Sequence, residues 1–409
     1  MTTSGETHAH ATGGDVSCPA CSSAVPEEAR FCHRCGCDER AAGGDARRTA
    51  SFAVQPGEPV AAFNLVSSLM PMASGSGVQA YKFALAAAVA LPVLVAMLGY
   101  LAFAFAAAAA VVPVAYLVYL YDVNEWEDQP VPVVLGAVAT AGVLGVLFTL
   151  FWQEVLLDPV LVLRGRDGGS FDGSRLVVLG LLVPVGAMAL AQLGPTLLAA
   201  RPRFDDLIDG LTFGVASGAT FAAAETLVLN RGLFDGFGSV ENPDSALWAA
   251  LVLSAAIVKP VVYGGAAGLA VAAFSGVGEG PGKTGPRHWR GVLESLALVA
   301  VHLIGLEVLR VLADGTAGAV MGLLWGAVVA AAVLVRVRYV LHVAVLEAAL
   351  DAATSGVVPS IANRGAGWCP ACQMPLLDEA SFCSACGSSV RAASKTDRRV
   401  LSAVAGEAK

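Results

Sequence analysis

An uncharged, apolar run from Phe83 to Tyr121, bounded by Lys82 and Asp122, constrains this chain more than any other feature. The hydrocarbon core of a membrane is about 30 Å thick, and an α-helix needs about 20 apolar residues to cross it. The run is long enough for two such helices. We therefore expect a transmembrane hairpin that turns near Gly99.

Further apolar spans follow this hairpin. Their approximate limits are Val131–Trp152, Leu176–Ala200, Leu207–Leu229, Ala246–Val277, Val292–Ala313 and Thr316–Val335. Only 14% of the residues are charged and 56% are hydrophobic, whereas about 25% are charged in a typical globular domain. This composition excludes a soluble multidomain enzyme. The predicted fold is an all-α polytopic membrane protein with about eight transmembrane helices between residues 82 and 338.

The net charge and the first residues of the chain limit its expected partners and its route to the membrane. The formal net charge is −8, which provides no basic surface for a phosphate backbone, so nucleic acid is not an expected partner. The polar opening stretch lacks the apolar core of a secretory signal peptide. The expected partners are the lipid bilayer and an unidentified membrane or cytosolic protein.

Basic residues in the loops predict the orientation of the chain. An even number of crossings returns the chain to its starting side, so both termini share one compartment. With cytosolic termini, the inside positions are Lys82, Arg201, Arg203, Lys283, Arg287, Arg290, Arg336 and Arg338, and the outside positions are Arg164, Arg166, Arg175 and Arg231. This asymmetry follows the positive-inside rule. We expect a multi-pass protein of the cell membrane with both termini cytosolic.

Two cysteine-rich segments form an internal repeat. Each contains two Cys-x2-Cys pairs separated by ten residues, with Pro-Ala inside the first pair and Gly after the second. Each pair forms a knuckle that directs two thiolates to one point, and two knuckles complete a tetrahedral zinc site. The sequence predicts two small zinc ribbons, at residues 18–37 and 367–390. Their structural zinc ligands are Cys18, Cys21, Cys32 and Cys35 in the first and Cys369, Cys372, Cys383 and Cys386 in the second.

The alternative to zinc is two disulfides in each segment, but nothing in the sequence places these segments outside the cell, and a reducing cytosol keeps thiolates available. A closed shell of four thiolates leaves no position for a catalytic water. Cys37 lies outside the repeat and is either a spare thiol or a competitor of Cys35. The other predicted segments are a disordered start at 1–17, a linker at 38–81, a cytosolic helix and linker at 339–366 and a disordered tail at 391–409.

Two stretches of the apolar region resemble a known family. The segment Tyr116–Pro130 (Tyr-Leu-Val-Tyr-Leu-Tyr-Asp-Val-Asn-Glu-Trp-Glu-Asp-Gln-Pro) resembles the end of the first hairpin in the PrsW family of intramembrane metalloproteases. Asp209-Gly210 followed by Phe221-Ala-Ala-Ala-Glu225 is similar to that family's Asp-Gly and Phe-x3-Glu motifs. The resemblance covers roughly residues 85–310 and implies a PrsW-like helical core.

The resemblance also implies candidate catalytic residues. In the family, a Glu-Glu-x2-Lys motif, the Phe-x3-Glu glutamate and histidines on later helices are thought to form the hydrolytic centre. Glu225 and His302 are the residues that remain. The other family positions carry Gly186 and Ala187 for the glutamate pair, Leu190 for the lysine, Ala256 near the first histidine, and Leu306 for an aspartate, next to Glu307.

The missing residues bear on function. Metal-assisted hydrolysis needs about three protein ligands, a position for water and usually a separate general base, which one Glu and one His cannot supply. We expect a non-proteolytic scaffold, or pseudo-protease, that binds or regulates a partner. The alternative is an active intramembrane metalloprotease that cleaves a membrane-anchored regulator, with Glu307 as a further ligand. A transporter has less support, because no inverted repeat is evident.

The ionisable residues of the apolar spans also have structural interpretations. Glu225 could reach the membrane interface, and His302 could hydrogen-bond a neighbouring helix. Lys259 lies too deep in its span to reach the interface, and an unpaired charge there costs about 3 kcal/mol. We therefore predict that Lys259 pairs with Glu225, directly or through His302 or water.

Two glycine motifs predict close helix contacts. Gly214-x3-Gly218 and Gly264-x3-Gly268 each place small residues on one helix face. Such faces let two helices approach closely in a membrane.

Overall fold

The computed structural model describes residues 15–19, 21–27, 29–34, 39, 76–122, 131–156, 173–201, 204, 207–235, 244–276, 284–354, 377, 380, 383 and 384. The chain divides into a helical unit within Phe63–Ala344 and a terminal unit drawn from the segments before and after it. The predicted disordered tail at 391–409, and most of the predicted disordered start and of the linker at 38–81, lie outside the described residues.

Every described element of the helical unit is helical, which confirms the predicted all-α class. In chain order the elements are α3 (Ser76–Met97), α4 (Leu101–Asp122), α5 (Val131–Phe151), η2 (Trp152–Leu156), α7 (Gly173–Val177), η3 (Val178–Leu182), α8 (Val183–Ala199), α9 (Leu207–Leu229), η4 (Arg231–Leu233), α10 (Ser245–Leu253), η5 (Ser254–Val258), α11 (Lys259–Ser275), α12 (Pro286–Leu312) and α13 (Gly315–Thr354). The segments η2, η3 and η5 are π-helical turns that extend or join longer helices.

Within the described part of the chain, seven helical spans are long and apolar enough to cross a membrane. They are Leu101–Leu120, Pro132–Val155, Val178–Ala199, Leu207–Leu229, Ser245–Ser275, Pro286–Leu312 and Gly315–Leu341. Each coincides with a predicted span, so the multi-pass membrane class is confirmed. The first predicted span corresponds to α3, whose apolar part, Leu85–Met97, is shorter. The final helix, α13, continues past its span to Thr354.

The predicted hairpin between α3 and α4 is present and turns at Gly99. This residue has a φ of 87°, in the left-handed region that glycine adopts without steric cost. The amide of Tyr100 donates to the carbonyl of Val95 at 3.1 Å, which satisfies one of the carbonyls left at the end of a helix.

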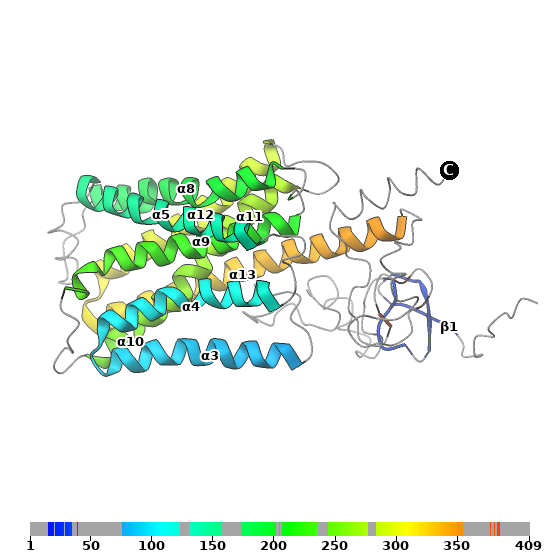
Figure 1. Cartoon of the computed structure of the whole chain (residues 1–409), viewed down its shortest axis with the longest axis horizontal. Helices are drawn as coiled ribbons and strands as arrows, with labels where there is room; N and C mark the ends of the chain where they lie inside the picture. The colour runs from blue at the N-terminus through cyan, green and yellow to red at the C-terminus, as the bar shows by residue number, and fades with distance from the viewer. Residues whose placement is uncertain are drawn as a thin grey trace, which may run out of the picture. The chain divides into compact units, whose positions relative to one another are not determined.

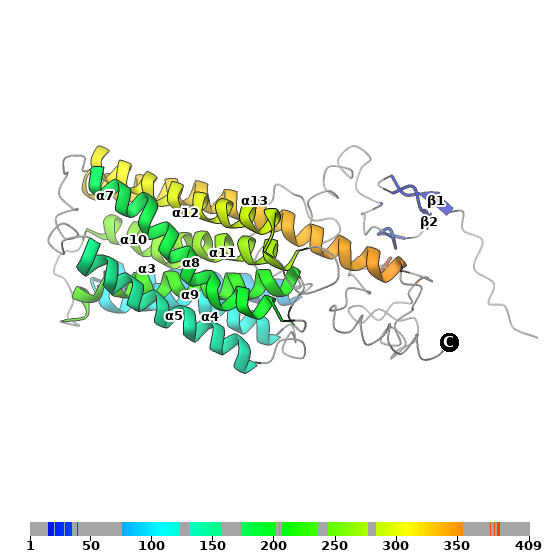
Figure 2. The same cartoon turned by 90° about the horizontal axis from the view of Figure 1, so that it is seen from above.

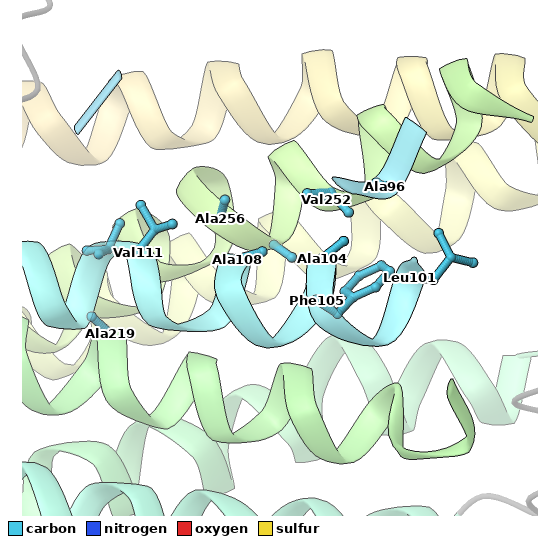
Figure 3. Close-up of a cluster of buried hydrophobic side chains, with 11 residues drawn as sticks. Ala96, Leu101, Ala104, Phe105, Ala108, Val111, Ala219, Val252 and Ala256 are labelled. Carbon is cyan, nitrogen blue, oxygen red and sulfur yellow. The ribbon is translucent and has the colours of Figure 1, made fainter. Parts of the chain in front are cut away.

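Small side chains pack α4 closely against its neighbours. Figure 3 shows Ala104, Phe105 and Ala108 of α4 between Ala219 of α9 and the α10–η5 segment. The absence of bulk on alanine lets helix backbones approach, which increases van der Waals contact where no water is present to drive association.

The helix α9 lies inside the bundle. It runs between α8 and α4 in Figure 1 and contacts α4, α5, α8 and α11. Of its apolar window 83% is buried, compared with 22% for α12, which lies with α13 at one edge of the bundle in Figure 2. Outward side chains such as Leu147 and Val328 are 59% and 64% exposed, as expected for surfaces that face lipid.

The two glycine motifs, each of which predicts a close helix contact, meet each other between α9 and α11. A Cβ atom added at Gly214 would lie 2.6 Å from the Cα of Gly268, and one added at Gly218 would lie 2.5 Å from the carbonyl oxygen of Tyr263. Only glycine permits this separation of backbones. Residue numbers rise along one helix as they fall along the other, so the helices are antiparallel.

The described part of the terminal unit contains a short hairpin. Strand β1 (Asp15–Ser17) pairs antiparallel with β2 (Ala24–Pro26), with Val16 opposite Val25. The three residues of β1 precede residue 18, the predicted start of the first ribbon, and form one strand of this pair.

Candidate functional site

Three cysteine side chains converge in the terminal unit. The Sγ atoms of Cys18, Cys21 and Cys32 all lie within 4.8 Å of one another, and those of Cys21 and Cys32 are 3.6 Å apart. Thiolates bound at 2.3 Å to tetrahedral zinc are about 3.8 Å apart. The cluster is therefore a possible metal site near the N-terminus.

The β1–β2 connection positions two of these thiols. The amide of Cys18 donates to the carbonyl of Ser23 at 2.9 Å, and the amide of Ser22 donates to the carbonyl of Cys18 at 2.8 Å. Ser22 adopts a φ of 60°, so the chain reverses tightly after Cys21. This turn forms the knuckle that the Cys-x2-Cys spacing predicts.

The other predicted zinc ligands divide into two groups. Cys383 is described and is fully buried. The remaining cysteines, which are Cys35, Cys37, Cys369, Cys372 and Cys386, lie outside the described residues. The second zinc site therefore stays a prediction.

The predicted contact between Glu225 and Lys259 is confirmed. The Nζ atom of Lys259 lies 3.2 Å from Oε2 of Glu225, and the two side chains are only 15% and 4% exposed. The ammonium group also lies 5.8 Å from the centre of the Tyr263 ring, a range in which a ring face attracts a cation. Lys259 is thus held between a carboxylate and an aromatic ring.

An offset between helices brings these residues to the same level. Glu225 lies one turn before α9 ends at Leu229, whereas all of α10 and η5 precede Lys259. Because α9 runs antiparallel to α11 and ends only four residues after Glu225, η5 lies beside the last turn of α9 and α10 extends past it. The glycine contact between α9 and α11 then sets the register in which Lys259 falls opposite Glu225.

His302 lies beside this pair, on α12. It is 1% exposed, and it interacts electrostatically with Lys259. The ring also lies against α13, because a Cβ atom added at Gly326 would be 3.1 Å from its Cε1. Trp325 donates its indole N–H to the backbone carbonyl of His302 at 3.3 Å, whereas the ring Nδ1 has no hydrogen-bond partner among the described residues.

Two adjoining cavities connect with this group. The first has a volume of about 390 Å³, and its ionisable lining residues are Glu225, Lys259, His302, Glu307 and Arg310. The second, of about 420 Å³, is mostly apolar and reaches Asp314 and Gly315 between α12 and α13. The residues that line both are Leu229, Asn230, Ser254, Lys259, Leu306 and Arg310.

The three π-helical turns in the described part of the chain all contribute to the first cavity, through Trp152 of η2, Leu179 of η3 and Ser254 of η5. Pro184 and Pro260 lie two residues after η3 and η5. A proline removes an amide donor and clashes with the carbonyl four residues earlier, and a wider turn relieves that clash. Single π turns are frequent at functional sites in helical proteins.

Some polar partners were not predicted. Arg310 forms an ion pair with Glu307, with Nη2 2.7 Å from Oε1. Their spacing of three residues on one helix could have predicted this pair. Gln192 of α8 donates to the hydroxyl of Ser295 on α12 at 2.9 Å, with both groups buried. The amide side chain of Gln192 within an apolar span could have indicated that it needs a hydrogen-bond partner there.

The cavity does not fit the metal centre that the PrsW resemblance implies. Glu225 and Glu307 are each engaged by a basic side chain. A Cβ atom added at Gly186 would lie 2.4 Å from the ring of Phe148, so a glutamate there would require that ring to move, and Ala256 is buried at the first histidine position. Among the residues that the structure describes, the cysteine cluster is the only group of three potential ligands whose atoms converge.

The chain matches no family model, no curated protein and no solved structure. Its sequence and structure establish a multi-pass helical membrane protein with an N-terminal cysteine cluster.

Proposed function

We propose that this chain is a PrsW-like membrane protein that binds a membrane-anchored client without hydrolysing it. The observation that carries this proposal is the 3.2 Å contact between Lys259 Nζ and Glu225 Oε2. In a metallopeptidase, a carboxylate in this position serves as a metal ligand or general base. Here an ammonium group balances its charge.

Electrostatics support a metal-free arrangement at Glu225. A divalent ion bound to this carboxylate would lie a few ångströms from the charge of Lys259, and like charges repel strongly where the dielectric constant is low. Lys259 cannot easily leave, because an unpaired ammonium group in a membrane span costs about 3 kcal/mol. The ion pair therefore disfavours the hydrolytic centre of the family.

In this proposal the client binds in the two cavities. Their walls are largely apolar, and Asn230, Ser254 and the buried ion pairs add a few polar groups, a combination typical of ligand sites. An apolar helix with a polar residue near its end matches this chemistry. The cysteine segments provide cytosolic contacts in this proposal, each organised by one structural zinc ion.

Metal analysis of the purified chain tests the proposal. We expect two zinc ions per chain, since the only four-thiolate sets are the two predicted ones, and one zinc ion after Cys21→Ser. Cys37→Ser is the matched control and should retain both ions. A third ion that Glu225→Gln removes would contradict a metal-free membrane cavity.

Proteolysis assays separate the proposal from the alternative, an active protease, which gains support because Glu225, His302 and Glu307 line one cavity. Tagged single-span proteins reconstituted with the chain in vesicles should remain intact with and without a chelator. Cleavage that Glu225→Gln and the chelator both abolish, but Glu294→Gln does not, would establish the alternative. Glu294 is the control because it pairs with Arg336 away from the cavity.

A further inference from the structure

The two cysteine segments contact each other through their backbones. The carbonyl oxygen of Ser384 accepts hydrogen bonds from the amides of Arg30 and Phe31, at 3.0 Å and 2.9 Å. Phe31 directly precedes Cys32, and Ser384 directly follows Cys383. The contact therefore joins the equivalent knuckles of the two repeats, although the whole helical unit separates them in sequence.

Side chains on both sides of this contact are buried. Phe31 and Cys32 are 5% and 0% exposed, and Ala380 and Cys383 are 4% and 0% exposed. Segments this short cannot bury a core by themselves. Burial on both sides therefore indicates a small core to which both segments contribute.

We infer that the C-terminal cysteine segment is the docking partner of the N-terminal one, and that the two form a single metal-dependent unit that holds the ends of the chain together. This inference goes beyond the proposed function, because it holds whether the membrane cavity binds a client or cleaves it.

The shared contact couples metal binding at one segment to the other. Metal binding supplies most of the folding energy of such small segments. Loss of Cys383 from its ligand set would release the adjacent Ser384 carbonyl, and the amides of Arg30 and Phe31 beside Cys32 would lose their acceptor. Changes in the hydrogen bonds that support a metal site weaken metal binding by about 10–100-fold, so Cys383→Ser should weaken zinc binding at the N-terminal cluster about tenfold.

The docking also determines the number of membrane crossings. A single folded unit cannot be divided by a bilayer, so both ends of the chain must lie on one side, and the number of crossings must be even. Seven of the described helical spans are long and apolar enough to cross a membrane. Among the described helices, α3 is then the one that supplies a further crossing, in agreement with the hairpin that the sequence predicts.

Cleavage of the linker tests the docking in the full chain. A protease site is inserted between residues 41 and 75, and the purified, zinc-loaded protein is cut. We expect the N-terminal fragment to remain bound to the membrane part, and to be lost after addition of a chelator or in Cys383→Ser. Cys37→Ser is the matched control and should retain the fragment. Loss of the fragment from the zinc-loaded wild-type chain would overturn the inference, and retention in Cys383→Ser would overturn the metal dependence.

A cross-link in the uncut chain covers the case in which Cys383→Ser fails to fold. A photoreactive phenylalanine analogue at position 31 should cross-link to the segment that contains residues 380–384 of the same chain. Isotope-labelled and unlabelled chains are mixed before irradiation. Mixed cross-links between labelled and unlabelled chains at the frequency expected for random pairing, or no cross-link to this segment, would overturn docking within one chain.

Discussion

Lys259 and Glu225 show how a single pair of residues can make a buried charge tolerable. Each would be costly to bury alone, because a membrane interior or a protein core solvates ions poorly. Together they lie 3.2 Å apart, beside the ring of Tyr263. The stabilisation belongs to the pair and not to either residue.

A double-mutant cycle tests this dependence. Lys259→Met and Glu225→Gln each leave one group buried without its partner, and each should lower the free energy of unfolding by roughly 3–5 kcal/mol. The double variant should lose less than the sum of the two. Denaturation of the purified protein in detergent provides the measurement.

Arg231→Ala is the control for this cycle. Arg231 binds Glu154, and both side chains are 50% exposed, so its loss should cost only about 0–1 kcal/mol. Additive losses for Lys259→Met and Glu225→Gln would show that the buried pair is not energetically coupled.

Among the elements, the contact between α9 and α11 has the greatest influence on the cavity. Its glycines bring the two backbones together and set their register, and this register places Glu225 opposite Lys259. The packing of helices in lipid depends on such close contacts, because no hydrophobic force drives one apolar helix against another there.

Substitution of one glycine tests this role. In Gly218→Ala the new Cβ atom would lie 2.5 Å from the carbonyl of Tyr263, so we expect a loss of about 1–3 kcal/mol in unfolding free energy from overpacking. Gly194→Ala on α8 is the control, since no atom lies within 4 Å of its new Cβ, and alanine should favour that helix. Equal stability of the two variants would contradict the role of the contact.

The start of α10 should depend on pH through Asp244. Its carboxylate accepts hydrogen bonds from the Thr316 hydroxyl and from the Leu247 amide, and these bonds, the Thr316 bond first, hold the pKa of Asp244 below its usual 3.8. A lowered folded-state pKa means that the stabilisation is complete above pH 3.8 and is lost as the pH falls through the folded-state value.

Hydrogen exchange of the Leu247 amide measures this effect. Exchange should accelerate on acidification below pH 3.8 in the wild-type chain, beyond the intrinsic pH dependence of exchange. Asp244→Asn retains an acceptor that does not titrate and should remove the additional acceleration. The same acceleration in Asp244→Asn would assign it to another group.

For the whole molecule, orientation is the property that labelling can test directly. The positive-inside asymmetry predicts that Asn230 lies outside and Gly285 inside. A membrane-impermeant thiol reagent applied to intact cells should therefore label Asn230→Cys and leave Gly285→Cys unlabelled until the membrane is opened. The reverse pattern would invert the topology and place the cysteine segments outside the cytosol.

The sequence by itself determined the class of this protein and much of its helical unit. Uncharged runs as long as Phe83–Tyr121 must be helical in lipid, because every backbone amide and carbonyl needs a partner within its own segment. The need of Lys259 for a counter-charge, the glycine contact and the convergence of Cys18, Cys21 and Cys32 follow from similarly local chemistry.

Only the tertiary structure decided which distant groups meet. The pairing of Gln192 with Ser295, the cavities bordered by π-helical turns and the contact between Phe31 and Ser384 all depend on the placement of separate segments. The sequence of a helix whose backbone hydrogen bonds are all internal says little about which neighbouring helix packs against it. Likewise, the sequence of a short cysteine segment does not specify which other segment will hydrogen-bond to its backbone. Those choices arise from the packing of the complete chain, in which side-chain volume and buried charge must be accommodated together.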